Sequence, residues 1–317
     1  MIHLLRLLSL LLLAIPGATA ADENIVNKDL NPPGQIVDIG GHRMHIHCQG
    51  KGQPTVILDS GAGGFSLEWI KIQNAISSLT RVCAYDRSGY GWSDMGPLPR
   101  TSKRLVDELH RLLFKAKVPG PYILVGHSFG GYVARYYASV YPKEMAGLVL
   151  IESSHPEQVE RLPQNKRNSK TQYPPHSRTY NVSHPVMHEH YPVQARANAY
   201  HLMSSWKYKF TQREEMLSLP HSAKEVQGAE PLPNIPLVVL TRGKRVWPNN
   251  DYGDEMEKIW MEMQDELALL NEGAIHLIAE RSGHSIHLDQ PEFVISALRV
   301  LLNNQGSTPS HSKQEGY

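Results

Sequence analysis

The chain has almost no excess charge of either sign, and this absence removes whole classes of partner. Its 32 lysine and arginine residues nearly balance 31 aspartate and glutamate residues, so the formal net charge is +1. No basic stripe or arginine-rich helix interrupts this balance. Nucleic acids and anionic membranes attract proteins that carry concentrated positive charge. We therefore expect neither as a partner.

Long hydrophobic runs are also scarce, because only residues 4–15 form one. Arg6 supplies a modest positive charge at its start, and Ala18-Thr19-Ala20 reads as a cleavage site for a signal peptidase. The run is too short for a helix that spans a bilayer. Residues 1–20 therefore predict a signal peptide cut after Ala20, and a secreted or periplasmic protein without stable membrane insertion. A retained membrane anchor is the alternative.

Cysteine is rare, with Cys48 and Cys83 alone in the chain. Both remain after removal of the predicted signal peptide, and both lie in segments with a strand-like pattern. An even pair in an oxidising compartment favours one disulfide bond. The alternative is two buried free thiols that pack as small apolar side chains.

The remaining composition is that of a globular enzyme, with 41% hydrophobic and 20% charged residues in 317. This length suits one large domain that carries an insertion. We expect a linker over residues 21–34 and a core formed by residues 35–154 and 233–302. Residues 155–232 lack a strand pattern and are too long for a simple loop, which predicts an inserted helical cap. The polar tail, residues 303–317, is predicted to be disordered.

Short apolar strands alternate with helical patterns along the core. This alternation predicts an α/β protein with a doubly wound, mostly parallel sheet of eight strands. The expected strands are residues 35–39, 43–48, 55–58, 81–85, 122–125, 145–151, 237–240 and 274–279. The expected helices include residues 68–79, 102–117, 254–270 and 291–302.

The most informative segment is Gly126-His-Ser-Phe-Gly130, which has the pattern Gly-x-Ser-x-Gly. An apolar strand precedes it and a helical stretch follows, so the chain must turn sharply at Ser128. Glycines on both sides of the serine let strand and helix cross closely. The segment therefore predicts a strained turn that presents the hydroxyl of Ser128 at the edge of the sheet.

A serine hydroxyl needs a general base, usually a histidine steered by a carboxylate. The chain has 17 histidines, so position must decide among them. His284 follows the eighth strand, in a loop at the same sheet edge as Ser128, and is our predicted base. His287 is the competitor, but it lies nearer the final helix and is expected to be a packing residue.

Taken together, these segments resemble the α/β-hydrolase superfamily over roughly residues 35–155 and 234–302. The resemblance rests on residues 126–131, on residues 86–93 (similar to the Asp-x-x-Gly-x-Gly-x-Ser turn), and on Ser282-Gly-His284 with residues 289–292. It implies a nucleophile, an acid and a histidine in that chain order. We expect Asp86 and Arg87 to pair with each other and stabilise the glycine-rich turn.

The resemblance also implies an oxyanion hole, formed by two backbone N–H groups that stabilise the charged intermediate. One belongs to the residue after the nucleophile, here Phe129. The other comes from the loop after the third strand, where family members usually read His-Gly-x. This chain reads Ser60-Gly61-Ala62, so Ala62 is the expected second donor.

The acid departs from the commonest family pattern, which places it just after the seventh strand. Residues 241–245 are basic there, and Asp251 and Asp254 come later. Glu152 ends the sixth strand, a placement similar to that of certain haloalkane dehalogenases. We therefore prefer Glu152 to Asp251 as the acid. Dehalogenases and epoxide hydrolases themselves are disfavoured, because both need aspartate where Ser128 stands.

The sequence thus predicts an exported serine hydrolase that cleaves an ester or related acyl bond of a small molecule. Its predicted catalytic residues are Ser128, Glu152 and His284, with no cofactor and no metal. A histidine-rich part of the cap is interpreted as solvated surface: His184, His188, Glu189, His190 and His201. One alternative is an aminopeptidase similar to proline iminopeptidases, with Glu189, Glu214 or Glu215 holding the substrate ammonium. The other is a non-catalytic binding protein on the same fold.

Overall fold

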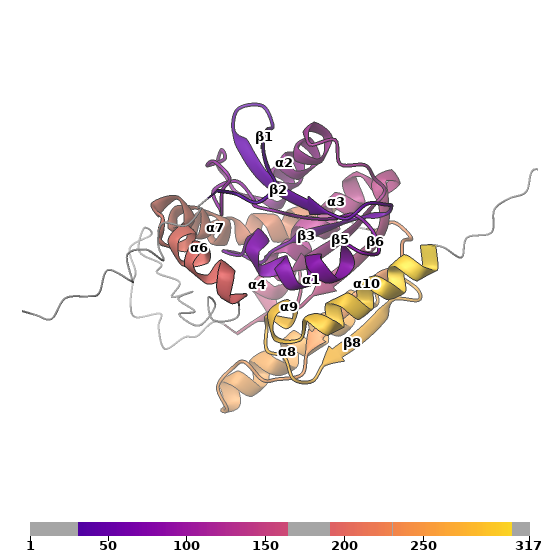
Figure 1. Ribbon diagram of the computed structural model, residues 1–317. Coiled ribbons are helices and arrows are strands. Elements are labelled where there is room, and N and C mark those ends of the chain that lie inside the picture. Colours follow the sequence, from indigo (N-terminus) through magenta and orange to yellow (C-terminus); the bar gives the residue numbers. More distant parts are fainter. Residues whose placement is uncertain (1–30, 164–190, 230, 306–317) are drawn as a thin grey trace, which may run out of the picture. The chain divides into compact units, whose positions relative to one another are not determined.

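Eight strands form a single mixed sheet in the computed structural model, which describes residues 31–163, 191–229 and 231–305 (Figure 1). The strand order across the sheet is β1-β2-β4-β3-β5-β6-β7-β8. The strands are β1 (Gln35–Asp38), β2 (Arg43–Gln49), β3 (Thr55–Asp59), β4 (Val82–Tyr85), β5 (Tyr122–His127), β6 (Met145–Ile151), β7 (Leu237–Arg242) and β8 (Ile275–Ala279).

The sheet is antiparallel at one edge and parallel elsewhere. Strand β2 pairs antiparallel with β1 and with β4, whereas the pairs from β4 to β8 are parallel. Gly40 and Gly41, both with positive φ, turn the chain between β1 and β2. Cys48 and Cys83 lie directly opposite each other on β2 and β4 and form a disulfide bond, which confirms that expectation.

Helices cover both faces of the sheet, as the sequence predicts for a doubly wound fold (Figure 1). The helical elements of the core are η1 (Ser66–Trp69), α1 (Ile70–Ile76), α2 (Ser102–Lys115), α3 (Phe129–Val140), η2 (Pro142–Glu144), α8 (Asp251–Ala268), α9 (Ile286–Asp289) and α10 (Pro291–Gln305). Helices α1 and α10 pack together on one face, and α2 packs against α3 on the other.

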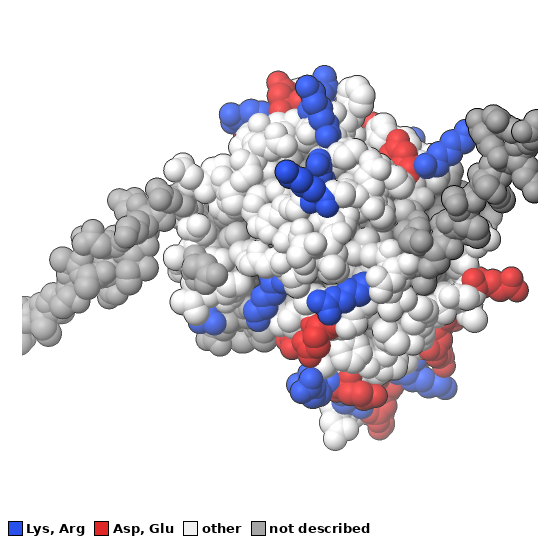
Figure 2. Space-filling model, turned by 45° about the vertical axis from the view of Figure 1, so that its right-hand side comes forward, with Lys and Arg blue, Asp and Glu red and all other residues white. Residues whose placement is uncertain are grey.

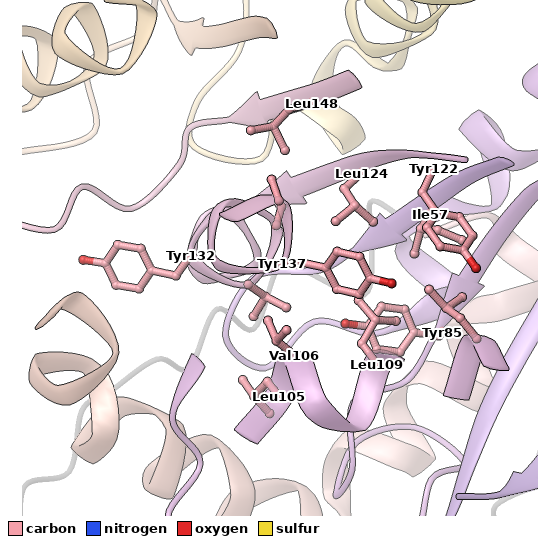
Figure 3. Close-up of a cluster of buried hydrophobic side chains, with 14 of the residues drawn as sticks. Ile57, Tyr85, Leu105, Val106, Leu109, Tyr122, Leu124, Tyr132, Tyr137 and Leu148 are labelled. Atoms are coloured by element: carbon pink, nitrogen blue, oxygen red, sulfur yellow. The ribbon is translucent and has the colours of Figure 1, made fainter. Parts of the chain in front are cut away.

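Alternation along the strands divides the core into two layers. Ile57, Cys83 and Leu124 face the layer of α2 and α3, where Leu109 and Tyr137 pack against them (Figure 3). Their neighbours along the strands, such as Val56, Ala84 and Ile123, face the layer of α1 and α10. The central strands are buried on both faces, as parallel strands under helices must be. The packed sheet thus holds the carboxyl ends of its parallel strands side by side.

The segment between β6 and β7 is helical in its described residues. It contains α4 (Gln158–Arg161), α6 (Val193–Ser204) and α7 (Trp206–Gly228). The hydroxyl of Ser205 caps α7 by accepting a hydrogen bond from the backbone N–H of Tyr208. Helix α7 packs on α2 and α3, so the segment rests directly on the core.

Several predicted segments lie wholly or mostly outside the described residues, among them the signal peptide (1–20), most of the linker (21–34) and most of the tail. Helix α10 continues to Gln305, three residues past its predicted end. The helix predicted over residues 68–79 is instead a 3₁₀ turn, η1, followed by α1. The short helix α9 was not predicted.

Charges of both signs are interspersed on the face in Figure 2, without a broad field of either. This distribution agrees with the near-zero net charge. Within the described ranges, none of the helices combines the length and the apolar character needed to cross a membrane.

Candidate active site

Ser128 stands between β5 and α3 in a backbone conformation that few serines adopt. Its φ is 50° and its ψ is −118°, so it lies in the left-handed half of conformational space, which is strained for a residue with a Cβ. A Cβ on Gly126 would lie 2.4 Å from the carbonyl oxygen of Gly130, and one on Gly130 would lie 2.6 Å from that of Asp59. Only glycine fits these two positions, as the sequence pattern predicted.

Hydrogen bonds to the end of β6 hold this strained turn. The backbone N–H of Ser128 donates to the carbonyl of Ile151 at 3.0 Å, and its carbonyl accepts from the N–H of Ser154 at 3.0 Å. The same carbonyl accepts from Gly131 at 2.9 Å, which begins helix α3. The residues around Glu152 therefore brace the turn directly.

His284, between β8 and α9, is held beside the same turn by the residue that precedes the serine. The Nε2 of His127 donates to the carbonyl oxygen of His284 at 3.0 Å, and the two rings are 4.9 Å apart. Burial, together with His287 and His284, lowers the pKa of His127 well below its usual value. His127 is therefore neutral, and its single ring N–H serves to position His284. Sequence reasoning missed this role of His127.

Glu152 lies directly after β6, fully buried and with a positive φ of 44°. Its Oε2 lies 3.2 Å from Nδ1 of His284, so the structure brings together two residues that are 132 apart in sequence. An ionised carboxylate only accepts hydrogen bonds, so Nδ1 carries the proton. The other ring nitrogen, Nε2, is then the one that can accept a proton.

A buried arginine, Arg242 at the end of β7, fixes the carboxylate of Glu152. Its backbone N–H donates to Oε1 at 2.9 Å and its Nη1 to Oε2 at 2.8 Å, while the indole N–H of Trp260 donates to Oε2 at 3.1 Å. Burial alone would raise the pKa of Glu152, but the hydrogen bond and charge of His284 and the charge of Arg242 outweigh it and lower the pKa. Glu152 is therefore a fixed anion at neutral pH.

The other candidate acids lie elsewhere. Asp251 is exposed at the start of α8 and makes no hydrogen bond or ion pair with His284 in the described structure. Asp254 pairs with Arg245 at 2.6 Å. The basic residues at the end of β7 thus have a structural role, because Arg242 holds the carboxylate of Glu152, which follows the neighbouring strand.

His287 is a packing residue, as its position predicted, but it also faces a second buried carboxylate. Its ring stacks on Trp69 with centroids 4.6 Å apart and lies 4.3 Å from the ring of His127. Its Nε2 is 3.5 Å from Oε2 of Glu68, and the Oε1 of Glu68 accepts from the hydroxyl of Tyr191 at 3.2 Å. Trp69 and Glu68 thus hold His287 against His127, the residue that contacts His284.

The two expected oxyanion donors flank the serine. Phe129 is the first residue of α3, and the loop with Ala62 lies against the turn, because a Cβ on Gly61 would be 3.2 Å from the Cβ of Ser128. In the described structure the backbone N–H groups of Ala62 and Phe129 have no hydrogen-bond partner. Unpaired N–H groups in so enclosed a place are rare, and they remain available to an anionic oxygen.

The expectation that Asp86 and Arg87 pair with each other was wrong. Asp86 pairs with His45 at 2.9 Å and accepts the backbone N–H groups of Ser66 and Trp92, which does stabilise the glycine-rich turn. Arg87 instead pairs with Asp59 at 2.6 Å and with Glu215 of α7 at 2.9 Å. Adjacent residues project in different directions from the end of β4, so neighbourhood in sequence did not decide the pairing.

One described group could in principle hold a metal ion: His155, Glu157 and Glu266. The guanidinium of Arg161 already occupies it, with Nη1 2.6 Å from Glu266 and 3.3 Å from Glu157. We therefore interpret the group as an ion-pair cluster. Among the cap histidines of the sequence analysis, His201 is exposed on α6, and His184, His188 and His190 lie outside the described residues, as does Glu189.

A strained serine turn after β5, a carboxylate after β6 and a histidine after β8, all at one sheet edge, define the architecture of an α/β hydrolase. Residues 56–297 match the alpha/beta hydrolase family. The chain therefore belongs to this family, and the fold predicted from its sequence is confirmed.

Three known proteins illustrate the range of this likeness. The chain is 26% identical over 297 residues to a probable transporter, efuK, of Hormonema carpetanum, covering 83% of this chain but 42% of that protein. An esterase of Thermogutta terrifontis superimposes with a TM-score of 0.57 at 20% identity, covering 83% of this chain and 94% of the esterase. An ancestral haloalkane dehalogenase gives a TM-score of 0.67 at 15% identity, covering 86% and 100%. At these identities the two structures establish the fold alone.

Proposed function

We propose that the protein is an exported serine hydrolase that cleaves an ester or related acyl bond of a small molecule. Ser128 is the nucleophile, His284 the general base, and Glu152 the acid that orients His284. The backbone N–H groups of Ala62 and Phe129 stabilise the oxyanion. The observation that carries the proposal is the 3.2 Å contact between Glu152 and Nδ1 of His284, a histidine held beside the strained serine turn.

In the proposed first step, the Oγ of Ser128 attacks the acyl carbon while Nε2 of His284 takes the hydroxyl proton. The carbonyl oxygen becomes an anion and accepts hydrogen bonds from Ala62 and Phe129. His284 then gives the proton to the leaving alcohol, which departs and leaves an acyl-enzyme. Water, activated by the same histidine, hydrolyses this ester and restores Ser128.

The fixed charge of Glu152 suits its proposed role. When His284 takes a proton it becomes a cation, and an anion that already faces Nδ1 stabilises it without rearrangement. Arg242 balances part of this charge through its bond to Glu152, and Arg242 itself is shared with a second carboxylate, Glu257. The positive charge that His284 acquires on proton transfer therefore forms beside a negative charge that is already in place.

Export is part of the proposal and is supported by the disulfide bond of Cys48 with Cys83. Such bonds persist in oxidising compartments and are rare in the cytosol. A serine esterase would also explain why the site lacks the nucleophilic aspartate that dehalogenases require.

The aminopeptidase alternative finds less support. A substrate ammonium needs a carboxylate that is not already paired, yet Glu215 is fully buried against Arg87 and Glu214 pairs with Arg213 at 2.8 Å. The third candidate, Glu189, lies outside the described residues. We therefore place this reaction second.

Hydrolysis of p-nitrophenyl acetate and p-nitrophenyl butyrate by the wild-type protein and by Ser128→Ala tests the proposal. We expect turnover by the wild type and a loss of about 10³-fold or more in the variant. Equal rates for the two proteins would contradict the proposal and favour a non-catalytic binding protein.

A further inference from the structure

Arg87 lies beneath the oxyanion loop and uses every N–H group that it has. Its Nε donates to Oε1 of Glu215 at 2.9 Å, and its Nη2 donates to Oε2 of the same carboxylate at 3.0 Å. Its Nη1 donates to Asp59 at 2.6 Å and to the carbonyl oxygen of Ser60. Its Nη2 also donates to the carbonyl oxygen of Gly61 at 2.7 Å. The guanidinium is 2% exposed, so these contacts replace all its hydration.

The carbonyl oxygen of Gly61 accepts from Arg87 and also from the backbone N–H of Gly64 at 3.0 Å, and these two bonds fix the direction of the neighbouring N–H group. The peptide bond between Gly61 and Ala62 is trans, so its C=O and N–H point in opposite directions. Because the carbonyl of Gly61 points to Arg87, the N–H of Ala62 points away from it. The loop's other face meets the serine turn, where Gly61 lies against Ser128 and His127. Arg87 therefore helps to orient the N–H group of Ala62, the proposed oxyanion donor, away from the guanidinium.

The carboxylate on the far side of Arg87 comes from helix α7, 128 residues away in sequence and in the segment between β6 and β7. Glu215 is fully buried and also accepts from the hydroxyl of Tyr90 at 2.8 Å. Helix α7 has no slack at this place, because a Cβ on Gly89 would lie 1.9 Å from Oγ1 of Thr211. The position of α7 thus sets the position of the guanidinium.

We propose that Arg87 and Glu215 are positioning residues for the oxyanion hole, and that helix α7 is a structural part of the catalytic site rather than only a cover for substrate. This inference rests on the proposed function. The guanidinium of Arg87 is hydrogen-bonded on every side and holds the loop in place before substrate binds. Such preorganisation stabilises the transition state more than the ground state. Loss of the pairing between Arg87 and Glu215 should lower kcat and leave KM nearly unchanged.

Glu215→Gln tests this inference, with Glu214→Gln as the matched control one position earlier on the same helix. Glutamine keeps the size of the side chain but cannot accept both N–H groups of Arg87. For p-nitrophenyl butyrate we expect kcat to fall about 10-fold or more in Glu215→Gln, with KM changed less than about 3-fold. The affinity for butylboronic acid, which forms a tetrahedral adduct on the serine, should fall in parallel with kcat/KM. Glu214→Gln should match the wild type in all three quantities.

A second variant covers the outcome in which Glu215→Gln does not fold, as judged by circular dichroism. Tyr90→Phe removes only the hydroxyl that donates to Glu215, and we expect a fall in kcat of about 2- to 5-fold with unchanged KM. A folded Glu215→Gln, or a Tyr90→Phe, with the kcat of the wild type overturns the inference while the hydrolase assignment stands. A wild-type protein that does not hydrolyse the esters overturns the proposed function, and this inference with it.

Discussion

The two halves of the candidate site are each built around a buried arginine, but the two arginines hold different things. Arg242 donates to a side chain, the carboxylate of Glu152, and its second partner is Glu257 of helix α8 in the core. Arg87 donates to Asp59 and to the backbone carbonyls of Ser60 and Gly61 in the core, and its remaining partner, Glu215, comes from helix α7 of the inserted segment. The proposed acid–base half therefore lies within the core, whereas the proposed oxyanion half also contacts the inserted segment.

Because their arginines have different partners, the two halves of the site should respond differently to mutation. A buried ion pair that loses one partner leaves an uncompensated charge in the interior, which is strongly destabilising. The acid–base half can fail in this way within the core alone. The oxyanion half can also fail by displacement of α7, without any change in the core. Mutations in the inserted segment are thus expected to alter turnover as well as substrate choice.

The largest effect should come from Glu152→Gln, which breaks the acid–base half. The amide cannot stabilise a protonated His284 as an anion does, and it can place His284 in the wrong tautomer. We expect kcat for p-nitrophenyl butyrate to fall about 10²- to 10⁴-fold.

Asp251→Asn is the matched control, because it removes the other candidate acid. Asp251 is exposed and does not contact His284, so the kcat of the Asp251→Asn variant should stay within about 2-fold of the wild type. If only Asp251→Asn lost activity, the assignment of the acid would be wrong.

Arg242→Met should test how strongly the core half depends on its arginine. The change leaves the buried carboxylate of Glu152 without its main counter-ion. We expect the free energy of unfolding to fall by about 3–5 kcal/mol, measured by urea denaturation. Arg245→Met, which removes a partly exposed pair with Asp254, should cost less than about 1 kcal/mol. Equal losses in the two variants would refute this account of Arg242.

The disulfide bond stabilises the fold but belongs to neither half of the site, so its removal should affect stability alone. Cys48 and Cys83 are 35 residues apart, so the bond restricts a sizeable loop of the unfolded chain. Replacing both by alanine should lower the free energy of unfolding by about 3–4 kcal/mol. Well below the melting temperature, kcat should match the wild type, and a large loss of kcat in the folded variant would show a link to the site.

The smallest effect is a pH dependence at the start of the inserted segment. Burial, with the charge of Arg135, lowers the pKa of His155 to about 4, although Glu266 and Glu157 act in the opposite direction. The unfolded chain takes up this proton near pH 6.5, whereas the folded protein does so only near pH 4. Stability should therefore be complete above pH 6.5, fall as the pH drops to 4, and level off below.

We expect His155 to account for about 1–2 kcal/mol of this loss, because the imidazole is only partly buried and solvent weakens the effects of burial and of Arg135 on its pKa. Urea denaturation of His155→Gln between pH 7 and pH 4 should show a flatter pH dependence than the wild type. His201→Gln, at an exposed position on α6, should follow the wild-type curve. A wild-type slope in His155→Gln would show that other groups carry the effect.

Much of the architecture could be predicted from the sequence because strand and helix patterns are local. The Gly-x-Ser-x-Gly turn placed Ser128, the order of strands placed His284 at the same edge, and the resemblance to certain haloalkane dehalogenases indicated Glu152. The expected disulfide followed from an even pair of cysteines in a protein predicted to be exported. The placement of Ser128 and His284 needed only periodicity, glycine sterics and the rule that parallel strands share a carboxyl edge, whereas Glu152 also needed the family resemblance.

What could not be predicted depends on which side chains meet across the fold. Arg242 appeared only as a basic residue where an acid was expected, and its pairing with Glu152 requires that β6 and β7 be neighbours. The partners of Arg87 are 28 and 128 residues away, so the adjacent Asp86 was the wrong guess. His127 looked like a variable position in the serine motif, yet it holds His284 through a backbone carbonyl.

The most direct test of the central claim is covalent labelling with a fluorophosphonate, followed by mass spectrometry of the tryptic peptides. The reagent reacts only with a serine whose hydroxyl is activated by a base and whose oxyanion is stabilised. We predict a single adduct on Ser128 of the folded wild-type protein, and none on Glu152→Gln at the same exposure time. Absence of the adduct from Ser128 in the folded wild type, or its presence on another serine, would contradict the account.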